Sequence, residues 1–251
     1  MELRAVPLLF PVAVFVSAAL LFLVEPMFAR MVLPKLGGAP AVWNTCVAFY
    51  QALLLAGYAY AHVLAERLRA KTQIAIQLTL ILMAALWLPV GVAAAWTPAP
   101  FEHPSLTVIR WLLRGLGLPF FVLAASGPLF QQWFALSRGA GSNPYRLYAA
   151  SNAGSLLALL AYPVAIEPTL RLRAQSLLWA AGYAALAFIA VGCGLAAWNA
   201  QSADPRATGS SHGYGSARHT GGSGPVAIPS HPVRIPWSTR VRWLGLRLSH
   251  A

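Results

Sequence analysis

Long apolar stretches alternate along the chain with short polar or proline-rich segments. Each stretch has about twenty residues or more, which is the length that a helix needs to cross a hydrocarbon core of about 30 Å. The pattern predicts an all-α, polytopic helical membrane protein with about six transmembrane helices. The predicted spans are residues 5–24, 40–63, 73–96, 115–136, 145–166 and 174–198.

The segments between and after the spans differ in character. Residues 27–38 and 105–114 combine basic and apolar positions, which favours a location at the membrane surface. Three prolines mark residues 97–104 as a loop. Residues 1–199 are therefore expected to form one transmembrane domain. The Gly-, Ser-, Pro- and His-rich residues 200–236 are expected to be disordered, and residues 237–251 to form a short helical remnant.

The composition indicates that lipid is the solvent for most of the surface. The chain is 58% hydrophobic and only 10% charged, whereas a soluble domain has about a quarter of its residues charged. The formal net charge is +12, but the basic residues are scattered and belong to no nucleic-acid-binding motif. We therefore expect the lipid bilayer as a partner and no nucleic acid.

The distribution of Lys and Arg predicts that both termini face the cytoplasm. In this orientation twelve basic residues lie on the inner side, six of them in the tail, and six lie on the outer side. The basic loop at 66–71 and the acidic loop at 97–104 favour the same orientation. The outer basic residues are Arg30, Lys35, Arg110, Arg114, Arg171 and Arg173.

The second predicted span carries a polar stripe. It consists of Asn44, Gln51, Tyr58 and His62, which are separated by 7, 7 and 4 residues. At about 100° per residue these spacings keep the four side chains within about 40° of one another. The stripe is a candidate polar path or ligand cleft, because polar groups at bilayer depth are costly without a partner or a task. The alternative is that they form hydrogen bonds between helices.

Two further spans contribute polar candidates. Gln131 and Gln132 follow a Ser-Gly-Pro sequence at 126–128. A proline there frees a backbone carbonyl, as in the interrupted helices of transporters, and a simple bend is the alternative. In the fifth span, Asn152 lies beside small residues at 150, 154 and 158, which predict a close helix contact.

Glu25 and Glu167 each precede a proline at the predicted outer end of a span. A carboxylate at this depth is a candidate site for a cation or for proton movement. The alternative is an interfacial ion pair with Arg30 or Arg171.

We expect no catalytic residue, cofactor or metal, and therefore a protein that is not an enzyme. The chain contains no Walker A motif, no paired Cys-x-x-Cys and no Gly-rich nucleotide loop after a strand. Cys46 and Cys193 lie at different predicted depths, too far apart for a disulfide. The histidines of the tail have no metal-ligand spacing.

Three blocks of residues carry a resemblance to a known family. They are PMFARMVLPKLGGAPAVWNTCVAFYQALLLAGYAYAH (26–62), SGPLFQQWFA (126–135) and NPYRLYAASNAGSLLALLAYPVAIEP (143–168). Together they resemble the membrane region of bacterial fused transporter-like and spermidine-synthase-like integral membrane proteins. The resemblance implies a major-facilitator-like membrane region in the bacterial cytoplasmic (inner) membrane. In many members this region precedes a cytoplasmic aminopropyltransferase- or methyltransferase-type domain.

The enzymatic part of that architecture has no counterpart motif in this sequence, so no synthase activity is carried over to any residue. Residues 239–246 resemble the start of the family's next helical block and residues 247–251 depart from it, which suggests a truncated or frameshifted member. Two functions stay open. One is a transporter-like domain for a small polar or cationic solute, which needs a homodimer or a second half. The other is a non-transporting membrane anchor or partner module for a cytoplasmic synthase-like protein of polyamine or methyl-transfer chemistry.

Overall fold

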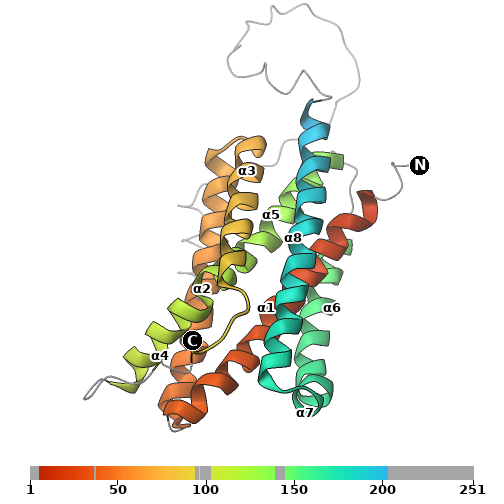
Figure 1. The fold of residues 1–251 in the computed structure, drawn as a ribbon. Coiled ribbons are helices and arrows are strands. Elements are labelled where there is room, and N and C mark those ends of the chain that lie inside the picture. Colours follow the sequence, from red (N-terminus) through yellow and green to blue (C-terminus); the bar gives the residue numbers. More distant parts are fainter. Residues whose placement is uncertain (1–5, 37, 94–95, 97–102, 139–144, 203–251) are drawn as a thin grey trace, which may run out of the picture. The chain divides into compact units, whose positions relative to one another are not determined.

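The computed structural model describes residues 6–36, 38–93, 96, 103–138 and 145–202, which are predominantly helical (Figure 1). Two π-helical segments, η3 (Leu113–Gly117) and η5 (Tyr162–Ile166), and the 3-10 turn η2 (Ala85–Trp87) adjoin the longer helices. The predicted disordered segment and the predicted remnant lie outside the described residues, except that residues 200–202 belong to the last helix. The helices are α1 (Val6–Leu36), α2 (Pro40–Arg67), α3 (Ala70–Ala84), α4 (Pro104–Leu112), α5 (Leu118–Arg138), α6 (Tyr145–Ala161), α7 (Glu167–Thr169) and α8 (Leu172–Ser202).

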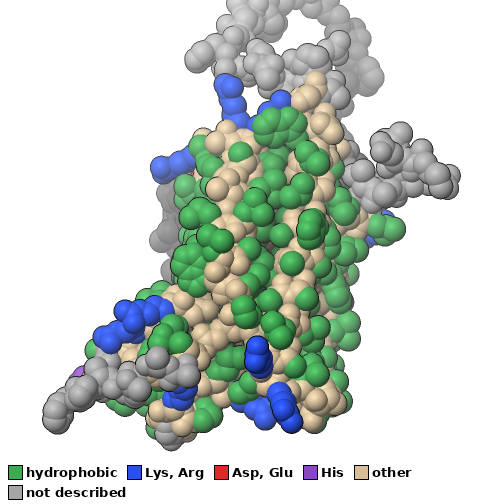
Figure 2. All heavy atoms as spheres, viewed as in Figure 1, with side chains coloured by type: hydrophobic (Ala, Val, Ile, Leu, Met, Phe, Trp, Pro, Cys, Tyr) green, Lys and Arg blue, Asp and Glu red, His purple; other side chains and the backbone are tan. Residues whose placement is uncertain are grey.

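The described part of the chain forms an all-α, polytopic helical membrane protein, as the hydrophobic pattern predicts. Six of its helical stretches are long and apolar enough to cross a membrane, by length and composition. Figure 2 shows hydrophobic side chains over the middle of one face and Lys and Arg side chains toward its two ends. The six stretches are Leu8–Leu36, Pro40–Arg67, Ala70–Trp87, Pro104–Ser137, Tyr145–Thr169 and Leu172–Ser202.

The first span is longer than predicted. α1 continues through most of the expected surface segment 27–38 and ends at Leu36. Pro26 and Pro34 lie inside this helix, because a membrane helix tolerates proline where neighbouring groups satisfy the freed carbonyl. Gly38, with a φ of 59°, then turns the chain into α2 in a left-handed conformation that glycine adopts without strain.

The third and fourth spans also differ from their predicted bounds. The third ends at Trp87 rather than at residue 96, because Pro89 and Gly91 follow and neither supports a helix interior. The expected surface helix 105–114 and the span 115–136 are one continuous stretch joined by η3. A π-helical segment is an insertion within a helix rather than a break, so the two predicted elements merge.

The helices pack in two layers. One layer is the row α2, α5, α1, α6, in which each helix contacts the next. The other layer is formed by α3 and α8, which contact each other and α5, while α8 also contacts α1. In Figure 1, α8 lies in front of α1. The layer of α3 and α8 covers one side of the row, and we refer to the opposite side as the α2–α6 face.

Glycines allow the closest helix contacts within the row. A Cβ atom on Gly154 of α6 would overlap the backbone carbonyl of Phe15 in α1. A Cβ atom on Gly57 of α2 would lie 2.6 Å from the Cβ of Ala124 in α5. The small residues at 150, 154 and 158 therefore mediate a helix contact, as predicted, because small side chains let two backbones approach closely.

Aromatic side chains fill much of the interior of the bundle. Two of them also hydrogen-bond to the backbone of a neighbouring helix: the Trp179 indole donates to the Leu20 carbonyl at 2.8 Å, and the Tyr183 hydroxyl donates to the Ile81 carbonyl at 3.1 Å. These hydrogen bonds matter because apolar side chains and lipid chains offer no hydrogen-bond acceptor to a buried indole or hydroxyl. The largest fully buried aromatic side chains are Trp133, Trp179, Tyr183, Phe10, Phe28, Phe120 and Phe130. The interior of the described bundle is therefore a packed core.

We expect the Gly154→Ala variant to be less stable by about 1–3 kcal/mol, because the added methyl group overpacks the contact between α1 and α6. The matched control is Gly127→Ala in α5, where a Cβ atom would meet no heavy atom within 4 Å and alanine is the better helix former. Thermal unfolding of both purified variants in detergent measures the difference. Equal stability of the two variants would contradict the close contact at Gly154.

Candidate functional site

α5 lies between α2 and α1 in the row. Its Phe120 ring stacks on Tyr50 of α2, and its Phe134 ring packs against Phe10 of α1, each with ring centroids 5.5 Å apart. Gly127 lies seven residues from both Phe120 and Phe134, so it points between the two contacts. A Cβ atom on Gly127 would meet open space. The middle of α5 is therefore accessible between α1 and α2.

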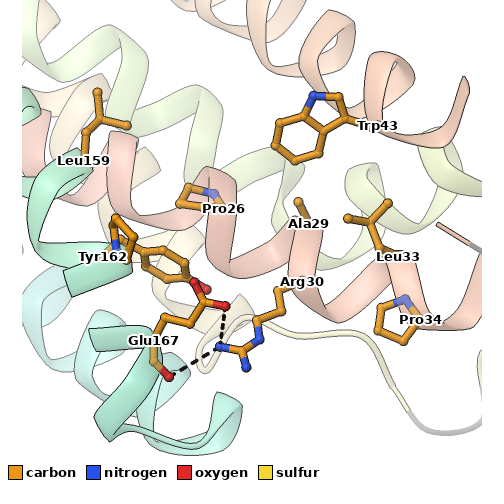
Figure 3. A pocket seen from close by; sticks show the side chains of 10 residues that line it. Pro26, Ala29, Arg30, Leu33, Pro34, Trp43, Leu159, Tyr162 and Glu167 are labelled. Carbon is orange, nitrogen blue, oxygen red and sulfur yellow. Dashed lines mark hydrogen bonds and ion pairs between the residues drawn. The ribbon is translucent and has the colours of Figure 1, made fainter. Parts of the chain in front are cut away.

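A pocket of about 490 Å³ lies at one end of the α2–α6 face (Figure 3). In Figure 3, Trp43 of α2 and Tyr162 of η5 lie on opposite sides of Ala29 and Arg30 of α1. We call this cavity the α2–α6 pocket, and most of its lining is apolar. The lining residues are Pro26, Ala29, Arg30, Leu33, Pro34, Trp43, Leu159, Tyr162, Pro163 and Glu167.

One ion pair lies in the wall of the α2–α6 pocket. Nη1 of Arg30 is 3.0 Å from Oε1 of Glu167 and also donates to the Glu167 backbone carbonyl at 3.4 Å. The two side chains are 43% and 40% exposed, so the pair contributes about 1 kcal/mol or less. Glu167 has the ion-pair partner that one of the two sequence interpretations anticipated. The pair offers a positive and a negative group to a ligand in the pocket.

Hydrogen bonds between helices hold the walls of the pocket. The Tyr162 hydroxyl donates to Oε1 of Gln175 in α8 at 3.3 Å, and the Gln175 amide donates to the Leu170 carbonyl at 2.8 Å. On the other side of α1, the Tyr50 hydroxyl donates to the backbone carbonyl of Glu25 at 3.3 Å. Tyr162 is the first residue of η5, and π-helical segments are frequent at functional sites. The pocket is therefore built between helices that are linked by specific bonds.

The predicted polar stripe lies on an exposed face of α2, and its four members share that face. Tyr58 is 50% exposed and lies about 60° from the pocket residue Trp43 around the helix axis. At the far end of the stripe, Nε2 of His62 is 3.2 Å from Oε1 of Glu66. The stripe therefore runs along the flank of α2 beside the α2–α6 face, rather than into the packed interior. Its members are Asn44, Gln51, Tyr58 and His62.

The remaining predicted residues divide between this face and other positions. Gln131 is exposed one turn after Gly127, and Asn152 of α6 is exposed seven residues before the pocket residue Leu159. At about 100° per residue, Gln131 lies toward the α2–α6 face. Asn152 lies about 160° from Gly154, the residue of α6 that contacts α1, so it points away from α1. Gln132 is partly buried and is turned about 100° away from Gln131. Glu25 is also partly buried, one residue before Pro26 of the pocket lining.

A buried polar contact that the sequence analysis missed joins α3 to α5. The Gln77 amide donates to the Ser126 hydroxyl at 3.0 Å and to the Val122 carbonyl at 3.2 Å. α5 stays helical through Pro128, so the Ser-Gly-Pro sequence does not unwind it. A glutamine within the apolar run of the third span was the available signal, because such a side chain requires a partner at that depth.

Comparisons of the chain with protein-family models, with curated proteins and with solved structures found no match. The resemblance to the transporter-like and spermidine-synthase-like membrane region therefore stays a prediction. In the part of the chain that the structure describes, no group of three or more His, Cys, Asp or Glu residues could hold a metal ion. The described residues form a polytopic helical membrane protein with polar residues beside its α2–α6 face and a pocket at the end of that face.

We expect a double-mutant cycle on Arg30→Gln and Glu167→Gln to give a coupling energy of about 0.2–1 kcal/mol that decreases with added salt, because both side chains are partly exposed. Thermal unfolding in detergent at low and high salt measures the coupling. The same cycle on Arg171→Gln and Glu167→Gln is the control and should be additive. Additive effects in the Arg30 cycle would contradict a functional ion pair in the pocket wall.

Proposed function

We propose that the protein is a transporter-like membrane domain for a small polar or cationic solute, with its path on the α2–α6 face. The observation that carries the proposal is the exposure of the polar stripe on α2, at a depth where an exposed helix face contacts lipid. A second membrane subunit covers this face and completes the path. The proposed membrane region is of the kind found in the transporter-like and spermidine-synthase-like family that the sequence resembles.

The cost of exposed polar groups in lipid supports this proposal. Gln51 of α2 and Gln131 of α5 lie inside their spans and are exposed. Amide groups that find no partner in hydrocarbon are unfavourable by several kcal/mol, so a face that carries several of them needs water or protein against it. The packed aromatic core leaves the α2–α6 face as the surface along which a polar solute can move.

A second copy of the chain is the proposed partner. A two-fold axis along the membrane normal places each residue opposite its own counterpart at the same depth. Asn44 and Gln51 suit such an interface because an amide carries both donors and an acceptor, so each can hydrogen-bond to itself across the axis. Transporters of comparable architecture also bind their substrates between two halves near the bilayer midplane. A homodimer would supply the second half.

The proposed location is the bacterial cytoplasmic (inner) membrane, with the N- and C-termini inside. Arg67, Arg69 and Lys71 lie at the junction of α2 and α3, which is the inner side in this orientation. The end of α1 that contains Arg30 is then the outer side. The α2–α6 pocket would open at the outer end of the path.

Cross-linking tests the proposed dimer. We expect a Gln51→Cys variant in native membranes to form a disulfide-linked dimer on mild oxidation, because the two-fold axis brings the paired Cα atoms within about 7 Å. The control is Thr79→Cys on the exposed face of α3, which should stay monomeric. The native Cys46 and Cys193 are fully buried and give little background. Failure of Gln51→Cys to link, or equal linking of Thr79→Cys, contradicts the interface.

Uptake into proteoliposomes tests the path itself. With spermidine, choline and glutamine as radiolabelled probes, we expect uptake of at least one by the native protein and loss of that uptake in the Gln51→Leu/Tyr58→Leu variant, which removes the polar wall. Thr79→Leu on α3 is the matched control and should retain uptake. A native protein that stays monomeric, transports none of the probes and copurifies with a soluble synthase-like protein would instead support the anchor function.

A further inference from the structure

The α2–α6 pocket has a charged end and an apolar end. Figure 3 shows the Arg30 side chain and the Glu167 carboxylate together beside Tyr162, whereas Trp43 and Leu33 lie away from the two charges. Trp43 is 46% exposed, and an indole of this kind gains from cover by another apolar group. A ligand that fills the pocket therefore needs a charged or polar head at one end and an apolar body at the other.

The two charges of the pocket are a positive and a negative group in direct contact. Nη1 of Arg30 is 3.0 Å from Oε1 of Glu167. A ligand with a single charge is attracted by one of these groups and repelled by the other from nearly the same distance, so the two effects largely cancel. A ligand with adjacent positive and negative groups gains from both, because its anion can face Arg30 while its cation faces Glu167.

The ion pair has the capacity to bind such a ligand. A guanidinium carries five N–H donors and a carboxylate has two acceptor oxygens, and Nη1 of Arg30 serves both bonds that join the pair. The two side chains are 43% and 40% exposed, so a ligand in the pocket can reach both groups. The pocket volume of about 490 Å³ lies within the range of small-molecule sites, which is about 300–1,000 Å³.

We propose that the α2–α6 pocket binds a zwitterion of the α-amino acid type with an apolar side chain. This inference rests on the proposed transport function, since it names the class of solute that enters the path. The ligand carboxylate binds the planar guanidinium of Arg30, which matches carboxylate geometry, and the ligand ammonium binds the carboxylate of Glu167. The apolar side chain of the ligand then lies toward Trp43 and Leu33.

Calorimetric titration of the full-length protein in a non-ionic detergent tests the ligand class. The probes share a phenyl ring: phenylalanine carries both charges, phenethylamine carries only the ammonium, and hydrocinnamate carries only the carboxylate. We expect the native protein to bind phenylalanine about tenfold more tightly than either analogue, because a hydrogen bond to a charged group contributes about that factor to affinity. Equal affinities for the probes would overturn the proposal.

Substitutions in the ion pair should change which probe is preferred. We expect Glu167→Gln to bind hydrocinnamate at least as tightly as phenylalanine, because Arg30 then attracts an anion without opposition. Arg30→Gln should show the corresponding change in favour of phenethylamine. An ion pair with a structural role alone would lower the affinities for all probes together, and that result would overturn the proposal. The control Arg171→Gln lies outside the pocket lining and should retain the native affinities.

A third variant tests the apolar end of the pocket. We expect Trp43→Ala to weaken phenylalanine binding about fivefold, since it removes an aromatic contact, and to retain the preference for phenylalanine over both analogues. Unchanged affinity would contradict the placement of the ligand side chain. Thermal unfolding of each variant confirms that it is folded, and we expect small shifts for the ion-pair variants because both partners are partly exposed.

Phosphatidylethanolamine separates a free solute from a lipid, because its headgroup is also zwitterionic. It should not displace phenylalanine when it is added to the detergent-purified protein. Displacement would overturn the proposal in favour of a lipid headgroup site.

The binding measurements do not depend on uptake, so the two proposals can fail separately. Uptake of spermidine or choline by a native protein that does not bind phenylalanine would overturn the ligand class and leave the transport function. Phenylalanine binding with the expected charge selectivity, in a protein that transports none of the probes, would overturn the transport function and support the ligand class.

Discussion

Close backbone approach at glycine is the interaction on which the arrangement of the helices depends. In lipid, apolar side chains gain nothing by leaving the solvent for a neighbouring helix, so packing quality decides which helices associate. Gly154 lets α6 approach the backbone of α1, and Gly57 lets α2 approach α5. Because α1 and α5 also contact each other, these two contacts produce the row α2, α5, α1, α6. The remaining long helices, α3 and α8, pack against each other on one side of that row.

This two-layer packing leaves the interior of the bundle filled and the polar candidates at its surface. The interior holds large aromatic side chains such as Trp133 and Trp179, which leave it filled. The polar stripe on α2 and the pocket beside the last turns of α1 are accessible features that lie outside this interior. The buried polar bonds, such as that from Gln77 to Ser126, link α3 to α5 within the core. They stabilise the packing, whereas the polar residues that could meet a solute lie outside it.

The sequence predicted the six spans, the helix contact at Gly154 and the possibility of an ion pair for Glu167, because each depends on local composition or short spacing. It also predicted that the four polar residues of α2 share a face. The direction of that face could not be predicted, since helical periodicity gives the angle between residues but not the rotation of the helix against its neighbours. The sequence did not predict the α2–α6 pocket for a related reason. Trp43 and Tyr162 are distant in sequence, and only the packing of α2 and η5 on either side of α1 places both in the lining of one cavity.

The charges in the wall of the α2–α6 pocket balance each other. In the α2–α6 pocket, Arg30 lies 3.0 Å from Glu167, so the positive charge is balanced and an anionic headgroup gains little by entering. The ion pair at Arg30 therefore joins α1 to α7 and leaves its part of the pocket wall without net charge.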